Sequence, residues 1–498
     1  MSISYILAKL FAPIVAKRTY KASSNASEVQ SALLKQLLEK AKHTKFGKAH
    51  HFSQIETYED YKKRVPVRDY EDLKHYIEEV VDGKPDILWK GKPAYFAKTS
   101  GTTSGNKYIP LTKDAVPTHM NAVRNALLLY VNETKQADFL KGKMIFLQGS
   151  PELEEKHGIK FGRLSGIAAH YIPKYLQKNR LPTWETNCID DWEKKVDAII
   201  EETLKEDMTL IGGIPSWVQM YFEGIVKKTG KKVGEVFPNF KLLVFGGVNF
   251  EPYKNKFDDL IGRKVDTLEL YPASEGFIAY QDKQKETGML LLVDNGIFYE
   301  FIPVDEFYKE NPTRLSIAEV QLNQNYVIIL STNAGLWAYN IGDTVSFTSL
   351  KPPRIVVTGR IKHFISAFGE HVIGKEVEEA MNLCTKGTEI QVTEFTVVPQ
   401  VNPSSGLPYH EWLIEFEKEP DNLDEFANRI DEEMQRQNSY YLDLIQGNIL
   451  TTLKISAIEK GGFKNYMKSI GKLGGQNKVP RLSNDRKIAD AMLAKSPK

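Results

Sequence analysis

The sequence predicts an α/β protein with a large N-terminal domain over residues 1–358 and a small, mobile α+β domain over residues 359–498. The length of 498 residues is more than one core usually needs. Short apolar runs alternate with helical patterns up to Gly288, which is typical of parallel sheets with flanking helices. From about 288 to 358, successive β patterns between turns indicate a β-barrel-like subdomain of the large domain.

Several elements of the large domain follow from apolar spacing. Residues 26–48 and 57–81 are expected to be helical, because apolar residues recur there at spacings of three and four. Strands are expected at Lys143–Gln148, Met208–Ile211 and Lys241–Phe245, with helices at Asp191–Lys205 and Ser216–Lys228. Glycine pairs at 212–213 and 246–247 follow two of these strands, where parallel sheets usually bind ligands.

The C-terminal 140 or so residues combine strands and helices in a different order. We expect strands near 390–399, 410–418 and 450–458, and helices near 374–383, 423–437 and 461–470. This pattern predicts one small sheet with helices on one face.

The N-terminal segment Ile3–Val15 is apolar but too short to span a bilayer, and Lys9 and Pro13 interrupt it. We expect a helix packed on the body, and contact with a membrane surface is the alternative. The two cysteines, Cys188 and Cys384, have no metal-binding spacing, which favours a reducing compartment. A net charge of +2 implies no nucleic-acid partner. The absence of other long apolar runs predicts a cytoplasmic protein without a membrane span.

The segment from Thr99 to Lys107 is rich in groups that bind phosphate. It holds five hydroxyl side chains, two glycines and one lysine in nine residues. Glycines let backbone N–H groups converge on an anion, hydroxyls donate to phosphate oxygens, and a lysine supplies charge. The segment is not a Walker-type P-loop, because Asn106 and Tyr108 replace residues that this motif requires. A solvated Ser/Thr/Gly linker is the alternative.

Four further segments carry polar groups at turns or boundaries: YPASEG at 271–276, YNIGD at 339–343, Gly359-Arg360, and GGQNKVPR at 474–481. Taken singly, each could be a turn, a domain linker or a basic tail. Their order and spacing resemble the adenylate-forming superfamily of acyl-CoA synthetases, luciferases and peptide-synthetase adenylation domains. The match is closest to the auxin-responsive Gretchen Hagen family of acyl-acid amido synthetases.

This resemblance covers nearly the whole chain. It includes TKFGKAHHFSQIETYEDYKKRVPVRDYEDLKHYI at 44–77, GGIPSW at 212–217 and the GGQNKVPR ending. That ending departs from the Pro-x-x-x-x-Gly-Lys pattern of acyl-CoA ligases, which favours the amido synthetases. The resemblance implies an enzyme that uses ATP and Mg²⁺ to activate a small carboxylic acid as its acyl-adenylate. The acyl group would then pass to an amine, such as an amino acid, whereas a thiol acceptor or a non-catalytic nucleotide-binding homologue are alternatives.

The resemblance also assigns residues to the nucleotide. The β- and γ-phosphates would be held by Ser100, Gly101, Thr102, Thr103, Ser104, Gly105 and Lys107. Adenine would stack on Tyr271 and face Gly247, Val248 and Asn249, with Ser274 close by. Asp343 would accept hydrogen bonds from the ribose, as a carboxylate does well, and Arg360 would hold the same sugar or the α-phosphate.

Two residues would act on the reaction itself. Glu275 would bind Mg²⁺, which commonly takes one carboxylate in addition to phosphates. Lys478 would reach the α-phosphate and the acid's carboxylate during adenylation. The same resemblance implies that the small domain, which carries Lys478, rotates between half-reactions with Lys362 as the hinge.

The acyl pocket should involve residues 147–165 and 211–218. Arg163 and His170 are candidates to contact a polar acyl substrate, and structural roles for both are the alternative. The identities of the acid and the acceptor, and the oligomeric state, do not follow from the sequence.

Overall fold

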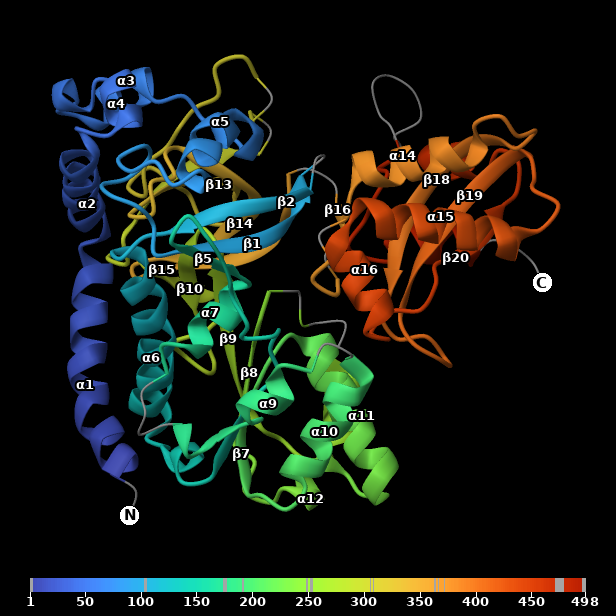
Figure 1. Ribbon diagram of the computed structural model, residues 1–498, viewed down its shortest axis with the longest axis horizontal. Helices are drawn as coiled ribbons and strands as arrows, with labels where there is room; N and C mark the ends of the chain where they lie inside the picture. The colour runs from blue at the N-terminus through green and yellow to red at the C-terminus, as the bar shows by residue number, and fades with distance from the viewer. Residues whose placement is uncertain are drawn as a thin grey trace.

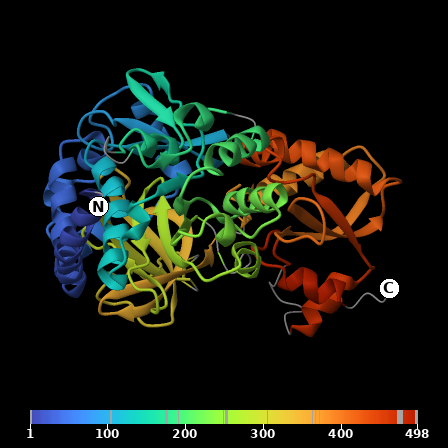
Figure 2. The ribbon, with the colours of Figure 1, turned by 90° about the horizontal axis from the view of Figure 1, so that it is seen from below.

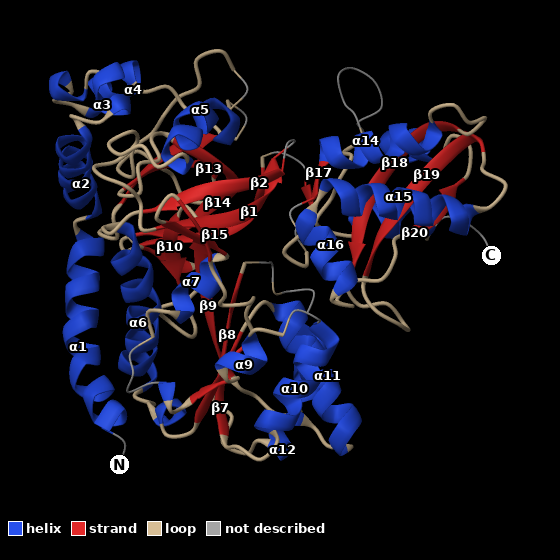
Figure 3. Cartoon of the chain, in the orientation of Figure 1, coloured by secondary structure: helices blue, strands red, loops and turns tan. Residues whose placement is uncertain are grey.

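The computed structural model describes residues 3–102, 105–172, 177–189, 192–247, 250, 254–304, 306–307, 309–361, 364–365, 367–370, 372–470 and 479–494. A large body and a smaller C-terminal domain lie side by side (Figure 1). Strands run through the interior of both parts, with helices outside them (Figure 3). The predicted class, a large α/β part with a small α+β part, is confirmed, whereas a boundary between residues 358 and 359 stays a prediction.

The body is organised around an eleven-stranded sheet with the order β12-β13-β14-β15-β11-β10-β9-β8-β7-β3-β6. Strands β6, β3, β7, β8 and β9 pair in parallel, and the pairs beyond β9 are antiparallel. The β-rich segment therefore continues the parallel sheet through its hydrogen bonds. The bounds are β3 Lys143–Phe146, β6 Arg180–Leu181, β7 Met208–Gly212, β8 Leu242–Gly246, β9 Asp266–Ala273, β10 Gly276–Tyr280, β11 Met289–Leu291, β12 Ile297–Pro303, β13 Asn325–Thr332, β14 Tyr339–Leu350 and β15 Pro353–Arg360.

Helices cover both faces of the parallel half of this sheet. Alternate residues of β3, β7 and β8 pack on α10 (Trp192–Thr203), α11 (Pro215–Thr229) and α13 (Lys254–Ile261). The other residues of these strands pack on α6 (Ala115–Thr134), which in turn carries α1 (Ile3–Ser24). This arrangement is expected for strands whose two faces are both apolar. Shorter helices are η2 Asp138–Leu140, α7 Leu164–Ala169, α9 Trp184–Asn187 and α12 Val233–Val236.

A second sheet of four strands, in the order β2-β1-β5-β4, lies over the antiparallel half. Its strands are β1 Tyr95–Thr102, β2 Gly105–Leu111, β4 Glu154–Lys156 and β5 Ile159–Gly162. The two expected N-terminal helices are each divided, because Thr44 and Asp69 cap new helices with their side chains. The resulting elements are α2 Ala26–Ala41, α3 Lys45–Ala49, η1 Phe52–Gln54, α4 Tyr58–Arg64 and α5 Tyr70–Val81.

The C-terminal domain is built on a three-stranded sheet in the order β18-β19-β20. Its expected strands are present as β18 Gln391–Gln400, β19 Tyr409–Lys418 and β20 Lys454–Ile458. Its expected helices are α14 Gly374–Thr385, α15 Leu423–Gln437 and α17 Gly462–Ser469. The pattern did not predict α16 (Ser439–Gln446), α18 (Lys487–Leu493) or the short pair β16 Phe364–Ile365 and β17 Val372–Ile373.

Two features bear on the cellular setting. Within the described part of the chain, every helix is too short or too polar to cross a bilayer. Cys188 and Cys384 are both free thiols, and burial raises the pKa of Cys384 to about 11. A thiol with a raised pKa is a weak nucleophile at neutral pH.

Candidate active site

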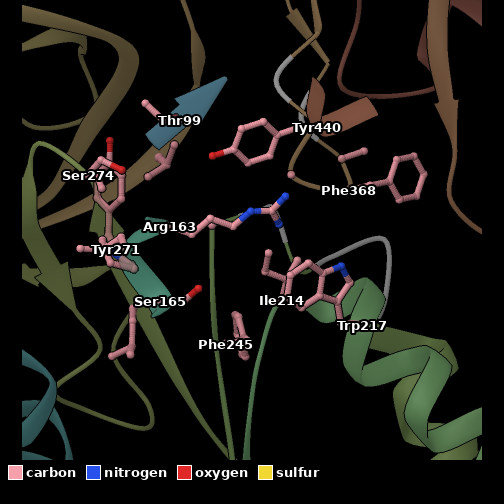
Figure 4. A pocket seen from close by; sticks show the side chains of 18 of the residues that line it. Thr99, Arg163, Ser165, Ile214, Trp217, Phe245, Tyr271, Ser274, Phe368 and Tyr440 are labelled. Carbon is pink, nitrogen blue, oxygen red and sulfur yellow. The ribbon is translucent and has the colours of Figure 1, made fainter. Parts of the chain in front are cut away.

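A cavity of about 1770 Å³ opens between the body and the C-terminal domain. Its walls come from the rim of the central sheet, from the β1–β2 hairpin, and from α16 and the segment 367–369 of the C-terminal domain. The rim lies at the carboxyl ends of β7 and β8, where parallel sheets of this kind bind their ligands. Figure 4 shows side chains from all of these elements around one space.

The cavity collects residues from motifs that are far apart in the sequence. All of the residues assigned to the nucleotide or its metal whose side chains are described line it, and so does the glycine at the end of β8: Lys107, Gly247, Tyr271, Ser274, Glu275 and Asp343. Ser274 and Glu275 form the turn between β9 and β10, where Ala273 pairs with Gly276. That tight hairpin presents both side chains at the rim.

Tyr271 and Asp343 contact each other directly. The Tyr271 hydroxyl donates a 2.5 Å hydrogen bond to Oδ2 of Asp343, and both side chains are buried. Asp343 pairs with Arg360 across β14 and β15, so the backbone of Arg360 lies opposite it. The three residues assigned to adenine and ribose therefore lie together, although the structure does not describe the side chain of Arg360.

The Gly/Ser/Thr segment forms the end of a β-hairpin. Thr99 pairs with Lys107 and Thr102 with Gly105, with an irregular register between the two pairs. Lys107 lies over the ring of Tyr70, 5.5 Å from its centroid, and the Tyr70 hydroxyl accepts from the backbone N–H of Tyr108 at 2.9 Å. Burial raises the pKa of Tyr70 to about 12, so it stays a neutral support for the Lys107 ammonium.

Some predicted residues lie outside what the structure describes. These are Thr103, Ser104, Val248, Asn249, Lys362 and Lys478, while Ser100, Gly101, Thr102 and Gly105 are described as backbone. The neighbouring Gly247 has φ of +85°, a conformation that favours glycine, and it leaves open space where a Cβ would lie. The cavity wall can therefore approach a flat ligand closely at this point.

One end of the cavity is apolar and aromatic. Ile214 and Trp217 come from the loop and first turn of α11, within the expected acyl-pocket segment. Phe245 and Phe250 stack with ring centroids 4.2 Å apart, and Phe368 closes the wall from the C-terminal domain. Sequence reasoning missed these three phenylalanines, because isolated aromatic residues in apolar runs have the same pattern as core residues.

Helix α16 brings the C-terminal domain against the body. The Tyr440 hydroxyl donates to the backbone carbonyl of Lys98 at 2.8 Å, and the Arg163 guanidinium lies 5.0 Å from the Tyr440 ring centroid (Figure 4). Arg163 also pairs with Asp443. Sequence reasoning named Arg163 but missed Tyr440 and Asp443, because their helix was not predicted. Asn438 could have marked that helix, since its side chain caps the N-terminus.

The other candidate for the acyl pocket, His170, has a structural role. Its Nε2 lies 2.8 Å from the carbonyl oxygen of Pro151, and its ring packs edge-on to Trp184. His170 is not among the residues that line the cavity. The structure thus supports the structural alternative for this histidine.

Glu275 is one acidic residue at the rim of the cavity that could hold a divalent cation. Among the described residues, no three histidine, cysteine or acidic side chains form a ready-made metal cluster. Glu275 is half-buried at the rim, close in sequence to Tyr271 and on the same hairpin. One carboxylate at a polar rim suits Mg²⁺, which completes its shell with phosphate oxygens and water.

Comparisons with known proteins identify the family of this chain. Models of the GH3 family N-terminal, central and C-terminal domains match residues 15–189, 290–360 and 375–487. Indole-3-acetic acid-amido synthetase GH3.10 of Arabidopsis thaliana is 23% identical over 94% of this chain and 95% of its own. Jasmonoyl–L-amino acid synthetase JAR4 of Nicotiana attenuata is 20% identical over 92% of this chain and 91% of its own.

Two solved structures share the fold. The GH3.15 acyl acid amido synthetase matches with a TM-score of 0.62 at 16% identity, over 98% of this chain and 96% of its own. A 2-hydroxyisobutyryl-CoA ligase, in complex with 2-HIB-AMP and CoA in the thioesterification state, matches with a TM-score of 0.60 at 15% identity. It covers 94% of this chain and 92% of its own. With all three of its domain models matched in order, the chain belongs to the GH3 family.

Proposed function

We propose that this GH3 protein is an ATP-dependent acyl-acid amido synthetase. It activates a small carboxylic acid as an acyl-adenylate, releases pyrophosphate, and transfers the acyl group to the amine of an amino acid. The observation that carries this proposal is the convergence of Lys107, Tyr271, Glu275 and Asp343 on one cavity that also has an apolar, aromatic end. The four polar residues suit a nucleotide, and the apolar end of the cavity suits the hydrocarbon part of an acid.

The polar wall would hold ATP. Tyr271 offers its ring to adenine, while its hydroxyl holds Asp343 in place to accept from the ribose hydroxyls. Backbone N–H groups of the β1–β2 hairpin and the Lys107 ammonium would hold the β- and γ-phosphates. Glu275 would hold Mg²⁺, which when bound offsets the negative charge of the phosphates.

The first step requires positioning more than proton transfer. A carboxylate is already ionised at neutral pH, so its oxygen can attack the α-phosphorus without a general base. The new O–P bond forms as the bond to pyrophosphate breaks, and negative charge grows on the departing group. We assign Lys107 to the stabilisation of that charge and Lys478 to the reacting phosphate. In the second step, the amine attacks the acyl carbon and AMP leaves.

The C-terminal domain would change its position between these steps, with Lys362 as the hinge. Tyr440, Asp443 and Phe368 contribute to the cavity from this domain, so its rotation would rebuild that wall. A cytoplasmic place for the enzyme is part of the same proposal, since ATP and free thiols are both compatible with it.

Acid-dependent exchange of labelled pyrophosphate into ATP tests the adenylation step. The native chain should exchange label only with a suitable acid present, and Glu275→Gln and Lys478→Ala should lose most of that activity. Glu154→Gln is a matched control, because Glu154 lines the cavity, is exposed and pairs with Lys98. The site assignment would be overturned if Glu275→Gln and Lys478→Ala exchanged label as fast as the native chain.

A further inference from the structure

Helix α1 packs with its small side chains and exposes its large ones. Ala8, Ala12 and Ala16 are buried in the cluster that α1 shares with α6. Spaced four residues apart, they form one face of the helix and let the two helices approach closely. The remaining surface of α1 carries the bulk of its apolar side chains.

Five large apolar residues of α1 face outward. Leu10 and Ile14 are 62% and 63% exposed, and the others are Ile6, Leu7 and Phe11 at 44%, 41% and 50%. The other large apolar side chains that are exposed in the described chain are distributed over several separate elements. Single exposed residues of that kind are ordinary, whereas a contiguous stripe on one helix indicates a binding surface.

The same outward face of α1 carries positive charge toward the C-terminal end of the helix, after the apolar residues. Leu7, Leu10, Ile14, Lys17 and Lys21 follow spacings of three and four, so they lie along one side of the helix. Helix α1 has four basic residues and no acidic one. Among the acidic residues around it, Asp138 pairs with Lys141, Glu133 with Lys283, and Asp282 with Arg354, whereas Asp294 interacts electrostatically with Arg18 of α1 itself.

We infer that this face of α1 docks the protein on an anionic lipid surface. The apolar stripe would enter the boundary between headgroups and acyl chains, while Lys17 and Lys21 would reach the phosphates of the headgroups. A second copy of the chain fits less well. Antiparallel pairing of two α1 helices would place lysines on the partner's apolar stripe, and parallel pairing would bring lysines together.

The position of α1 is compatible with activity on such a surface. In both ribbon views it lies at the end of the body opposite the C-terminal domain (Figures 1 and 2). The body could therefore rest on a bilayer while the C-terminal domain remains free to move. This inference is independent of the proposed ligase reaction.

Flotation of the full chain with vesicles tests it. The native protein should float with vesicles of phosphatidylcholine mixed with phosphatidylglycerol, and much less with phosphatidylcholine alone. The double variant Leu10→Gln with Ile14→Gln should bind roughly tenfold or more weakly, because two apolar side chains no longer gain from leaving water. Lys17→Gln with Lys21→Gln should reduce binding most at low salt, where charge attraction is least screened.

Leu322→Gln is the matched control, since Leu322 is 50% exposed and lies in the β-rich part of the body. It should bind vesicles as the native chain does. All variants alter exposed side chains, and unchanged thermal unfolding would verify their fold. No binding to anionic vesicles, or equal binding by the Leu10→Gln/Ile14→Gln variant, would overturn the inference. A dimer that this variant dissociates, without vesicle binding, would instead assign the face to a second copy.

Discussion

The hydroxyl of Tyr271 donates a 2.5 Å hydrogen bond to Oδ2 of Asp343, although the two residues lie on different strands of different motifs. Tyr271 is in β9 and Asp343 in β14, and the central sheet brings both to the wall of the cavity. The bond fixes the orientation of the Asp343 carboxylate. In the proposed ATP site, the ring of this tyrosine would contact the base, and its hydroxyl would act on the sugar through Asp343.

Removing this hydroxyl should weaken ATP use without unfolding the protein. Tyr271→Phe keeps the ring but leaves Asp343 without this donor, at a cost of about 1 kcal/mol, or roughly fivefold in the KM for ATP. Acid-dependent pyrophosphate exchange at varied ATP measures this change. Tyr130→Phe is the matched control, because it removes a 2.8 Å bond to Asp266 outside the cavity. Equal effects of the two variants on KM would contradict the assignment.

Weakening the contact of Arg163 with Asp443 should alter the balance of the two half-reactions. Both side chains are partly exposed, so the pair is worth about 0.2–1 kcal/mol. If the C-terminal domain alternates between two positions, Asp443→Asn should change the ratio of adenylation to amide formation by up to about fivefold. Single-turnover measurement of each step determines that ratio.

The control for this variant is Arg436→Gln, which breaks surface ion pairs within α15. It should leave both steps unchanged. A ratio for Asp443→Asn equal to that of the native chain would show that the contact does not select between domain positions.

Burial of His119 in α6 should make the protein less stable in mild acid. Burial lowers its pKa from 6.5 to about 4, so the folded state holds it neutral, while the unfolded chain takes up a proton below about 6.5. Stability is therefore lost as the pH falls from about 6.5 to about 4, and at pH 5 the loss is about 2 kcal/mol. Urea unfolding at pH 7 and pH 5 measures this difference in the free energy of unfolding.

His119→Gln should reduce the difference between the two pH values, because glutamine does not titrate. Replacing the exposed His43 in the same way should leave the difference as it is in the native chain. An undiminished pH dependence in His119→Gln would mean that other groups cause the acid sensitivity.

Several polar residues that line the cavity were singled out from the sequence, because they belong to short segments whose order and spacing resemble one family. Tyr271 and Glu275 belong to the segment YPASEG, which taken singly could be an ordinary turn and gains significance only from its order and spacing with the other segments. Strand β8, which ends at the rim of the cavity, was also predictable, since the apolar run Leu242–Gly246 is almost fully buried.

Other parts of the site could not be predicted from the sequence, because they depend on three-dimensional packing. Phe245 and Phe368 are apolar residues in ordinary surroundings, and only the fold brings them to one cavity. The segment Thr99–Lys107, which is proposed to bind phosphate, is largely paired as the end of β1 and β2, and its composition did not predict this pairing. Pro110 is tolerated in β2 because that strand lies at the edge of its sheet. The short helix α16 has one turn signal and little periodicity, so its contribution to the domain contact was missed.

The most direct test of the proposed reaction is the identity of its products. The purified protein would be incubated with ATP, Mg²⁺, a panel of carboxylic acids and either the amino acids or coenzyme A, and products would be identified by mass spectrometry. We expect AMP and an N-acyl amino acid in equal amounts, formed only when an acid, an amino acid and ATP are all present. A coenzyme A thioester without any amide would contradict the account, and would make this GH3 protein a thioester-forming ligase.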